Sequence, residues 1–203
     1  MASKKNLEVN ISTEEKIREA ARKVFTTKGY AATRTRDIAD EAGINLALLN
    51  YYFRSKDKLF EVVMLEKIKV LFGTVVPVIN NSELSIEDKI KGIVDIYIDM
   101  LLENPDLPIF VLSELRGKSD RFLQEMRIDL VLRESHLVQQ IKKRFPDRNP
   151  VQYIMSILGM TIFPFLMKPI FINVGVVNET QYKMLMLERK RLIPQWIKAI
   201  LKE

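Results

Sequence analysis

The residues best suited to chemistry lie in one short segment, 35–54, with the sequence TRDIADEAGINLALLNYYFR. Thr35 is suited to cap a helix, and Gly43 to end it, because glycine accepts the left-handed conformation found after many helices. Asn45 is suited to cap a second helix with an apolar side made of Leu46, Leu49 and Phe53. The outward side of that second helix would carry Asn45, Ala47, Leu48, Asn50 and Tyr51. This pattern predicts a helix-turn-helix whose second helix fits the major groove of DNA.

Helices on either side must position this segment. Apolar residues at helical spacing predict a helix from about residue 13 that ends at Lys28-Gly29, with Ile17, Ala20, Ala21, Val24 and Phe25 on its inner side. Ser55 is expected to cap a longer helix over 56–72. We therefore predict a DNA-binding helix-turn-helix domain over residues 1–55, in which residues 1–10 are disordered.

The remainder, residues 56–203, is predicted to be an effector-binding and dimerisation domain made only of helices. The periodic segments cover about 85–102, 107–116, 120–145, 150–167 and 180–201, with a loop over 169–178. No alternating strand pattern is present. The fold class is therefore all-α, with a three-helix N-terminal domain and about nine helices in total.

The charge of the chain favours a polyanionic partner. The formal net charge is +6, and residues 1–60 contain 12 Lys or Arg against 8 Asp or Glu, a net of +4. Cysteine is absent, so no disulfide or thiolate metal site is available. The N-terminus has no signal-peptide pattern, and the apolar region 154–172 is interrupted by proline, glycine and lysine. We read that region as a buried helix and expect a cytoplasmic protein with no membrane partner.

An enzyme is disfavoured by the same sequence. His136 is the single histidine, and neither a Gly-x-Ser-x-Gly elbow nor a glycine-rich phosphate loop occurs. The acidic pairs Glu14-Glu15 and Asp40-Glu41 are typical of solvated helix faces. We expect no catalytic residues, no metal and no cofactor.

Residues 13–60 resemble the DNA-binding domain of the tetracycline-repressor (TetR) family of bacterial transcription regulators. The resemblance rests on KIREAARKVFTTKGYAATRTRDIADEAGIN and on LLNYYFRSKDKLF, which includes Tyr51-Tyr52-Phe53 followed by Arg54-Ser55-Lys56. It implies a homodimer that places one helix of each protomer in a near-palindromic operator. It also implies a repressor controlled by a small-molecule effector bound among the C-terminal helices.

The resemblance assigns DNA contacts to individual positions. Positions that meet phosphates in the family are matched by Thr35, Asn50, Tyr51, Tyr52 and Lys56. Asn45, Leu46 and Ala47 begin the recognition helix, where Leu46 and Ala47 offer only apolar contact, for instance with thymine methyl groups. Because these residues offer few direct contacts to base edges, DNA shape or the flanking Arg34 and Arg36 can contribute to sequence recognition. Alternatives stay open: Tyr52 in the core, Lys56 simply solvated, and Asn45 only a cap.

Two further sets of residues follow from the C-terminal helices. Methionine, aromatic and scattered polar residues suit an adaptable effector pocket, with ordinary core packing as the alternative; the candidates are Tyr97, Met100, Phe110, Arg116, Met126, His136 and Tyr153. The last two helices would form the dimer interface through Ile154, Leu158, Ile162, Leu185, Leu192 and Trp196. The competing function is a non-enzymatic interaction protein whose helix-turn-helix does not bind DNA.

Overall fold

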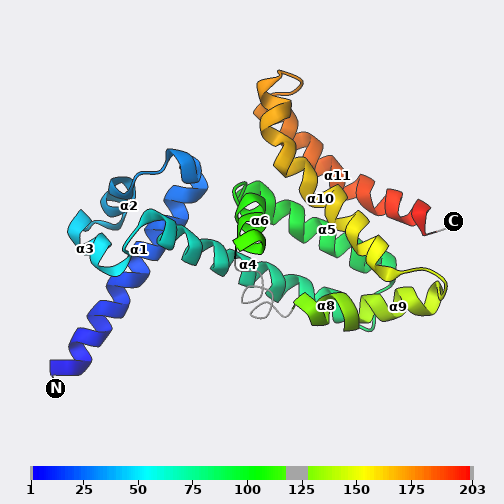
Figure 1. The fold of residues 1–203 in the computed structure, drawn as a ribbon, viewed down its shortest axis with the longest axis horizontal. Coiled ribbons are helices and arrows are strands. Elements are labelled where there is room, and N and C mark those ends of the chain that lie inside the picture. Colours follow the sequence, from blue (N-terminus) through cyan, green and yellow to red (C-terminus); the bar gives the residue numbers. More distant parts are fainter. Residues whose placement is uncertain (1, 118–127, 202–203) are drawn as a thin grey trace. The chain divides into compact units, whose positions relative to one another are not determined.

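The structure, a computed structural model, describes residues 2–117 and 128–201, with side chains for 13–113, 115 and 128–201. The predicted all-α class is confirmed, and the described residues contain no strand (Figure 1). Two compact units, Met1–Ile68 and Lys69–Glu203, divide the chain inside α4. The helices are α1 (Ala2–Ala32), α2 (Thr35–Ala42), α3 (Leu46–Tyr52), α4 (Lys56–Asn80), α5 (Ile86–Glu103), α6 (Leu107–Gly117), α8 (Ile128–Glu134), α9 (His136–Arg144), α10 (Pro150–Asn173) and α11 (Glu179–Ile200).

The N-terminal unit is held together by the apolar side of α1 that the sequence predicts. Helix α1 begins at Ala2, so residues 2–10 are helical where disorder is expected from the sequence. No proline or glycine precedes Gly29 to interrupt the helix. The core residues of this unit, all at most 6% exposed, are Ile17, Ala20, Ala21, Val24, Phe25, Ile38, Ala39, Leu49, Phe53, Leu59, Val63, Met64 and Ile68.

The connection between α1 and α2 is fixed by a small cluster of contacts. Gly29, with φ 73°, interrupts the helix where the sequence predicts its end. The buried Thr33 hydroxyl donates to the Gly29 carbonyl at 2.7 Å. The ring of Phe60 on α4 packs against Tyr30, with centroids 4.5 Å apart. The loop before α2 therefore has a defined path against the start of α4.

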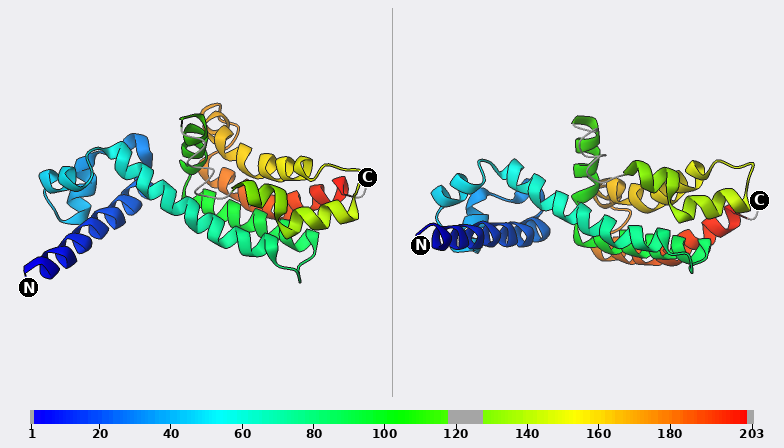
Figure 2. Two further views of the ribbon diagram at one scale, coloured as in Figure 1. Left: turned by 60° about the horizontal axis from the view of Figure 1, so that its bottom comes forward. Right: turned by 90° about the horizontal axis from the view of Figure 1, so that it is seen from below.

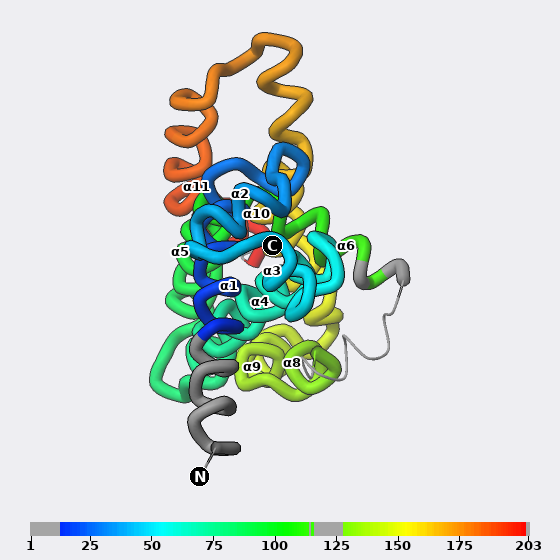
Figure 3. The backbone as a smooth tube through the Cα atoms, turned by 90° about the vertical axis from the view of Figure 1, so that its left-hand side faces the viewer, coloured from blue at the N-terminus to red at the C-terminus, as the bar shows by residue number. Residues whose placement is uncertain are grey.

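The C-terminal unit is arranged around α5, which contacts α9, α10 and α11. Helices α10 and α11 run antiparallel, joined by a short turn that contains Gly175 (φ 75°) (Figure 2). Helices α8 and α9 lie next to each other (Figure 3). The side of α5 that faces these helices consists of Ile90, Ile93, Val94, Ile98 and Leu101, all buried.

Helix α4 is longer than the predicted 56–72, because it continues through Gly73 and Pro77 to Asn80. The added turns extend one buried stripe, in which Val75 and Ile79 follow Leu71 at steps of four. Burial of this stripe outweighs the cost of a proline within the helix.

The predicted helix over 120–145 is divided at Ser135, and its residues 120–127 lie outside the described part of the chain. The buried Ser135 has an extended backbone (φ −58°, ψ 150°), and its hydroxyl accepts the Val138 N–H. The His136 N–H donates to Asn80 Oδ1 at 3.0 Å. Ser135 thus caps a new helix, α9, whose first residue is attached to the end of α4.

Helix α10 contains Pro164, as predicted, and continues beyond its predicted end near residue 167, through Pro169 to Asn173. A proline removes the N–H that would bond to the carbonyl four residues earlier, so Pro164 leaves the Met160 carbonyl without its helical donor. The Arg189 guanidinium of α11 supplies two donors there, with Nη2 at 2.7 Å and Nε at 3.2 Å. The Tyr182 hydroxyl donates to the Pro164 carbonyl at 3.1 Å. Contacts from α11 therefore stabilise α10 where proline weakens its backbone hydrogen bonding.

Only one face of α10 is covered, so the prediction of a buried helix is wrong for the chain taken alone. Tyr153, Ile157, Thr161 and Phe165 recur at steps of four and are buried. The other side exposes large apolar residues, Val151, Met155, Phe163 and Ile170. By length and composition α10 could cross a membrane, although it packs against α5, α6 and α11.

Candidate nucleic-acid interface

The start of α2 differs from the prediction in one residue. Arg34 occupies the cap position and Thr35 is the first helical residue. The Asp37 carboxylate accepts the Arg34 N–H at 2.9 Å and pairs with Lys28 at 3.1 Å. These contacts, the bond from Arg34 first, lower the pKa of Asp37. The Asp37 carboxylate bonds to the backbone N–H of the cap residue, Arg34, and this bond takes the place of the side-chain cap predicted for Thr35.

The turn between α2 and α3 has the chemistry that the sequence predicts. Gly43 is left-handed, with φ 66°. Its N–H donates to the Asp40 carbonyl, and the Ile44 N–H donates to the Ala39 carbonyl at 3.0 Å. This pair of bonds is a Schellman motif, which satisfies the last carbonyls of α2 within the turn.

Asn45 caps α3 as predicted, because its Oδ1 accepts the Leu48 N–H at 2.8 Å. The inner side of α3 is Leu49, fully buried, followed by Phe53. Leu46, which the sequence places on that inner side, is 37% exposed, because it occupies the first helical position at the edge of the core. The exposed face of α3 is therefore Leu46, Ala47, Asn50 and Tyr51.

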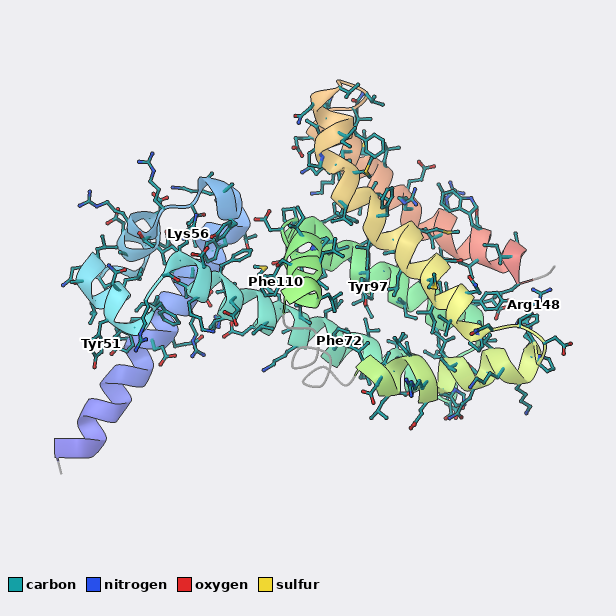
Figure 4. The ribbon with its side chains drawn as sticks, viewed as in Figure 1. Tyr51, Lys56, Phe72, Tyr97, Phe110 and Arg148 are labelled. Atoms are coloured by element: carbon teal, nitrogen blue, oxygen red, sulfur yellow. The ribbon has the colours of Figure 1, made fainter. Side chains whose placement is uncertain are left out.

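Tyr51 is the more exposed of the two exposed large apolar or aromatic side chains described in the N-terminal unit, at 80%, and it projects from α3 (Figure 4). Its ring meets Tyr52 edge-to-face, with centroids 5.4 Å apart. Tyr52 is half-buried, which supports a packing role for its ring. The phenol of Tyr51 is available to a partner from outside the chain.

The cations of this unit divide into those paired with its acidic residues and those that are not. On the α1 side, Arg22 pairs with Glu15, Glu19 and Glu66 at 2.5–3.0 Å. By contrast, Arg36 on α2 and Arg54 after α3 are exposed, and no ion pair involves either of them among the described side chains. The helix-turn-helix therefore presents cations that a polyanion can bind.

Lys56 is not the freely solvated lysine that the sequence left as an alternative. Its ammonium donates to the carbonyls of Tyr30 and Thr33, both at 3.0 Å, and lies 4.1 Å from the centre of the Tyr30 ring. Two of its three N–H donors are thereby used within the unit. Lys56 positions the loop before α2, and one donor remains for a phosphate.

Comparison with known proteins agrees with this geometry. Residues 17–63 match the model of the tetR family of bacterial regulatory proteins. The chain belongs to the tetR family. It is 26% identical over 165 residues to the probable HTH-type transcriptional regulator YttP of Bacillus subtilis, covering 78% of this chain and 79% of that protein. It is 30% identical over 134 residues to the HTH-type transcriptional repressor KstR2 of Mycolicibacterium smegmatis, covering 59% and 63%.

Solved structures show the same fold over nearly the whole chain. The fatty acid degradation regulator FadR of Bacillus halodurans matches with a TM-score of 0.60 and 19% identity, over 89% of this chain and 93% of that one. This TetR-family chain is thus a DNA-binding transcriptional regulator with a helix-turn-helix.

The candidate effector residues of this TetR-family chain do not form one described cluster. Tyr97 and Met100 lie on α5 and the buried Phe110 on α6. His136 bonds to Lys89, which is eleven residues before Met100 and hence ~16 Å away along α5. Tyr153 accepts a bond from Arg148 at 3.0 Å. Met126 and the side chain of Arg116 lie outside the described residues.

The position of His136 is explained by a buried lysine, Lys89, which no sequence motif singles out. Lys89 is fully buried, and its ammonium contacts His136 Nδ1 and Gln140 Oε1, both at 2.6 Å. No ion pair involves Lys89 among the described side chains. Burial of the ammonium lowers the pKa of Lys89 below its ordinary value.

Replacing Lys89 with methionine is expected to raise the free energy of unfolding at pH 7 by about 1 kcal/mol, because a buried charge without a carboxylate partner is removed. The half-exposed His136 and Gln140 can bond to water instead. Since the folded-state pKa of Lys89 is lowered, the unfolded chain binds more protons between that pKa and 10.5. The native protein therefore gains stability as the pH rises through this window, and K89M should not. Urea unfolding at pH 7 and pH 9.5 measures both effects; equal pH dependence in the two proteins would contradict the assignment.

Proposed function

We propose that this TetR-family regulator is a homodimeric repressor of the cytoplasm that binds a near-palindromic operator and is controlled by a small-molecule effector. The observation that carries the DNA-binding part is the exposed face of α3, which ends in the 80% exposed Tyr51. Local bonds at Gly43 and Asn45 fix the turn and the start of this helix. The nearby Arg36 and Arg54 supply positive charge.

The proposed contacts divide into two groups. Leu46, Ala47 and Asn45, at the start of α3, would face base edges in the major groove. The phosphate group would contact Thr35 and Arg36 at the start of α2, Asn50, Tyr51 and Tyr52 on α3, and the remaining donor of Lys56.

The decisive experiment is titration of DNA from upstream of the protein's own gene, over a series of salt concentrations. We expect Tyr51→Phe to weaken binding by about tenfold, because one hydrogen bond is lost in each half-site. The loss should be similar for specific and unrelated duplexes, since a phosphate contact carries no sequence information. Ser82→Ala, the loss of an exposed hydroxyl in the C-terminal unit, should bind normally. Unchanged affinity in Tyr51→Phe would remove Tyr51 from the interface, and no binding to any duplex would favour the interaction protein instead.

Arg36→Met provides a second readout in the same titration. Loss of one phosphate-neutralising cation in each half-site should reduce the slope of log affinity against log salt by about 2. Lys91→Met, at an exposed lysine paired with Asp95 in the C-terminal unit, should keep the slope. A slope that changes equally in both variants would show only an effect of net charge.

The dimer is supported by the uncovered sides of α10 and α11. Leu185 and Trp196 on α11 are exposed, and Leu192 is half-exposed between them. On α10 the predicted Ile154, Leu158 and Ile162 are half-buried, whereas Val151, Met155, Phe163 and Ile170 are more exposed on one side. Two antiparallel helices from each of two copies would cover these residues as a four-helix interface.

Effector control is supported by a buried polar group at the end of α5. Asn104, the residue that follows α5, is 4% exposed, and its Oδ1 has no hydrogen-bond partner among the described residues. Burial raises the pKa of Tyr97, on α5, to about 12. An effector bound against α5 and α6 would act on DNA binding through α4, whose last residue Asn80 is bonded to His136.

A further inference from the structure

In the part of the N-terminal unit whose side chains are described, large apolar side chains are exposed on one helix only. Among its described side chains, the exposed large apolar or aromatic residues are Leu46 and Tyr51, both on α3. At 100° per residue, Leu46 and Asn50 form one ridge of the exposed face, and Ala47 and Tyr51 the other. The first turn of α3 therefore presents hydrocarbon only, from Leu46 and Ala47.

The one polar side chain beside this turn is already engaged. Asn45 Oδ1 accepts the Leu48 N–H at 2.8 Å. An asparagine that reads adenine needs both its oxygen and its nitrogen. Asn45 would have to share the oxygen that caps the helix and keep its side chain in the cap orientation, and giving up the cap would cost about tenfold in the folding equilibrium of the helix. The start of α3 thus lacks a residue for hydrogen-bonded base recognition.

Among the base pairs, only A·T presents an apolar group in the major groove, the C5 methyl of thymine. Cytosine at the same position carries only a hydrogen at C5, so Leu46 and Ala47 would lose their apolar contact with the base. Apolar contact would therefore select thymine over cytosine.

We propose that this protein recognises its operator half-site through thymine methyl groups, which contact Leu46 and Ala47 at the start of α3. The proposal rests on the proposed function, since it requires α3 to lie in the major groove. Phosphate contacts then set the position of the helix, and the methyl groups set the sequence.

The test uses a duplex selected from random sequence by the purified full-length protein. Each thymine of one half-site is replaced by deoxyuridine, which lacks only the methyl group. At one or two positions, removal of the methyl group should weaken binding about fourfold, which is the value for exposing one methyl-sized group to water. The same change in both half-sites should weaken binding about 15-fold. 5-Methylcytosine paired with guanine at those positions should restore part of the loss caused by unmodified cytosine.

Leu46→Ala is the decisive variant. It should bind the thymine duplex more weakly and no longer distinguish thymine from uracil at its position. Because Leu46 is 37% exposed at the edge of the core, the melting temperature should fall by no more than a few degrees. The matched control, Tyr51→Phe, should weaken binding to both duplexes equally and keep the distinction.

The outcomes separate the two proposals. A specific duplex that tolerates uracil at every position would overturn the thymine-methyl proposal and leave the regulator intact. The same conclusion follows if Leu46→Ala keeps the full preference for thymine over uracil. Failure to select any duplex would overturn the proposed function itself.

Discussion

Phe163→Glu is expected to convert the dimer to a monomer and to weaken operator binding by at least about 100-fold. Phe163 lies on the uncovered side of α10 and is 56% exposed in the single chain. In the proposed dimer the two copies would bury this surface, and a carboxylate there would lose its water without gaining a partner. The monomer should keep its fold, since the residue supports no contact in the core of its own chain.

The loss of DNA affinity follows because the dimer holds two DNA-binding domains together. When one domain of a dimer binds a half-site, its partner is held near the other at a high effective concentration, which raises affinity by 10²–10⁴. A monomer has one half-site contact and about half of the salt dependence. Sedimentation at micromolar concentration should give 23.7 kDa for the variant and twice that for the wild type.

Val70→Glu is the matched control, because Val70 is also apolar and 59% exposed but lies on α4. It should remain dimeric and bind the operator normally. A wild-type protein that sediments as a monomer would refute the interface, and a dimeric Phe163→Glu would place the contact elsewhere. Binding of the wild type, but not Phe163→Glu, to phosphatidylcholine vesicles would show that α10 meets lipid instead.

Local chemistry explains why the helix-turn-helix could be predicted from the sequence. The Asn45 cap joins residues three apart, and the bonds around Gly43 span at most five. Ser85 and Asn178 cap α5 and α11 by the same short-range bonds. Such contacts depend on residue type and spacing, both of which are visible in the chain.

The errors arose where distant residues decide the structure. The sequence predicts a loop from residue 169 because proline lacks the N–H of a helical bond, yet α10 continues through Pro169 to Asn173. It does not reveal that the carbonyl freed by Pro164 is bonded to Arg189 on another helix. His136 is expected as a candidate ligand contact, yet its ring is bonded to Lys89, 47 residues away. Leu46 is expected on the inner side of α3 because its side chain is apolar, but the edge position of its backbone exposes it. A proline inside an apolar periodic run does predict an orphan carbonyl, although not the residue that satisfies it.

The bond from Arg189 to the Met160 carbonyl, which Pro164 leaves without its helical donor, leads to the second large expected effect. Arg189→Met should lower the free energy of unfolding by about 2 kcal/mol. The substitution removes the charged donor that bonds to the Met160 carbonyl of α10, and it leaves that acceptor without this hydrogen-bond partner. It also removes the contact between the guanidinium and the Trp196 ring, 5.2 Å apart. Urea unfolding at one fixed protein concentration measures the change, because the stability of a dimer depends on concentration.

Pro164→Ala tests the cause directly, because alanine restores the N–H that the Met160 carbonyl lacks. In the Pro164→Ala background, Arg189→Met should cost about 1 kcal/mol or less, so the two substitutions should show a coupling of about 1 kcal/mol. Effects of alanine on the unfolded chain appear in both halves of the cycle and cancel. An equal cost of Arg189→Met in both backgrounds would mean that Arg189 acts through Trp196 and not through the carbonyl. The expected coupling would show that a side chain of α11 completes the backbone hydrogen bonding of α10, which holds the proposed dimer surface in place.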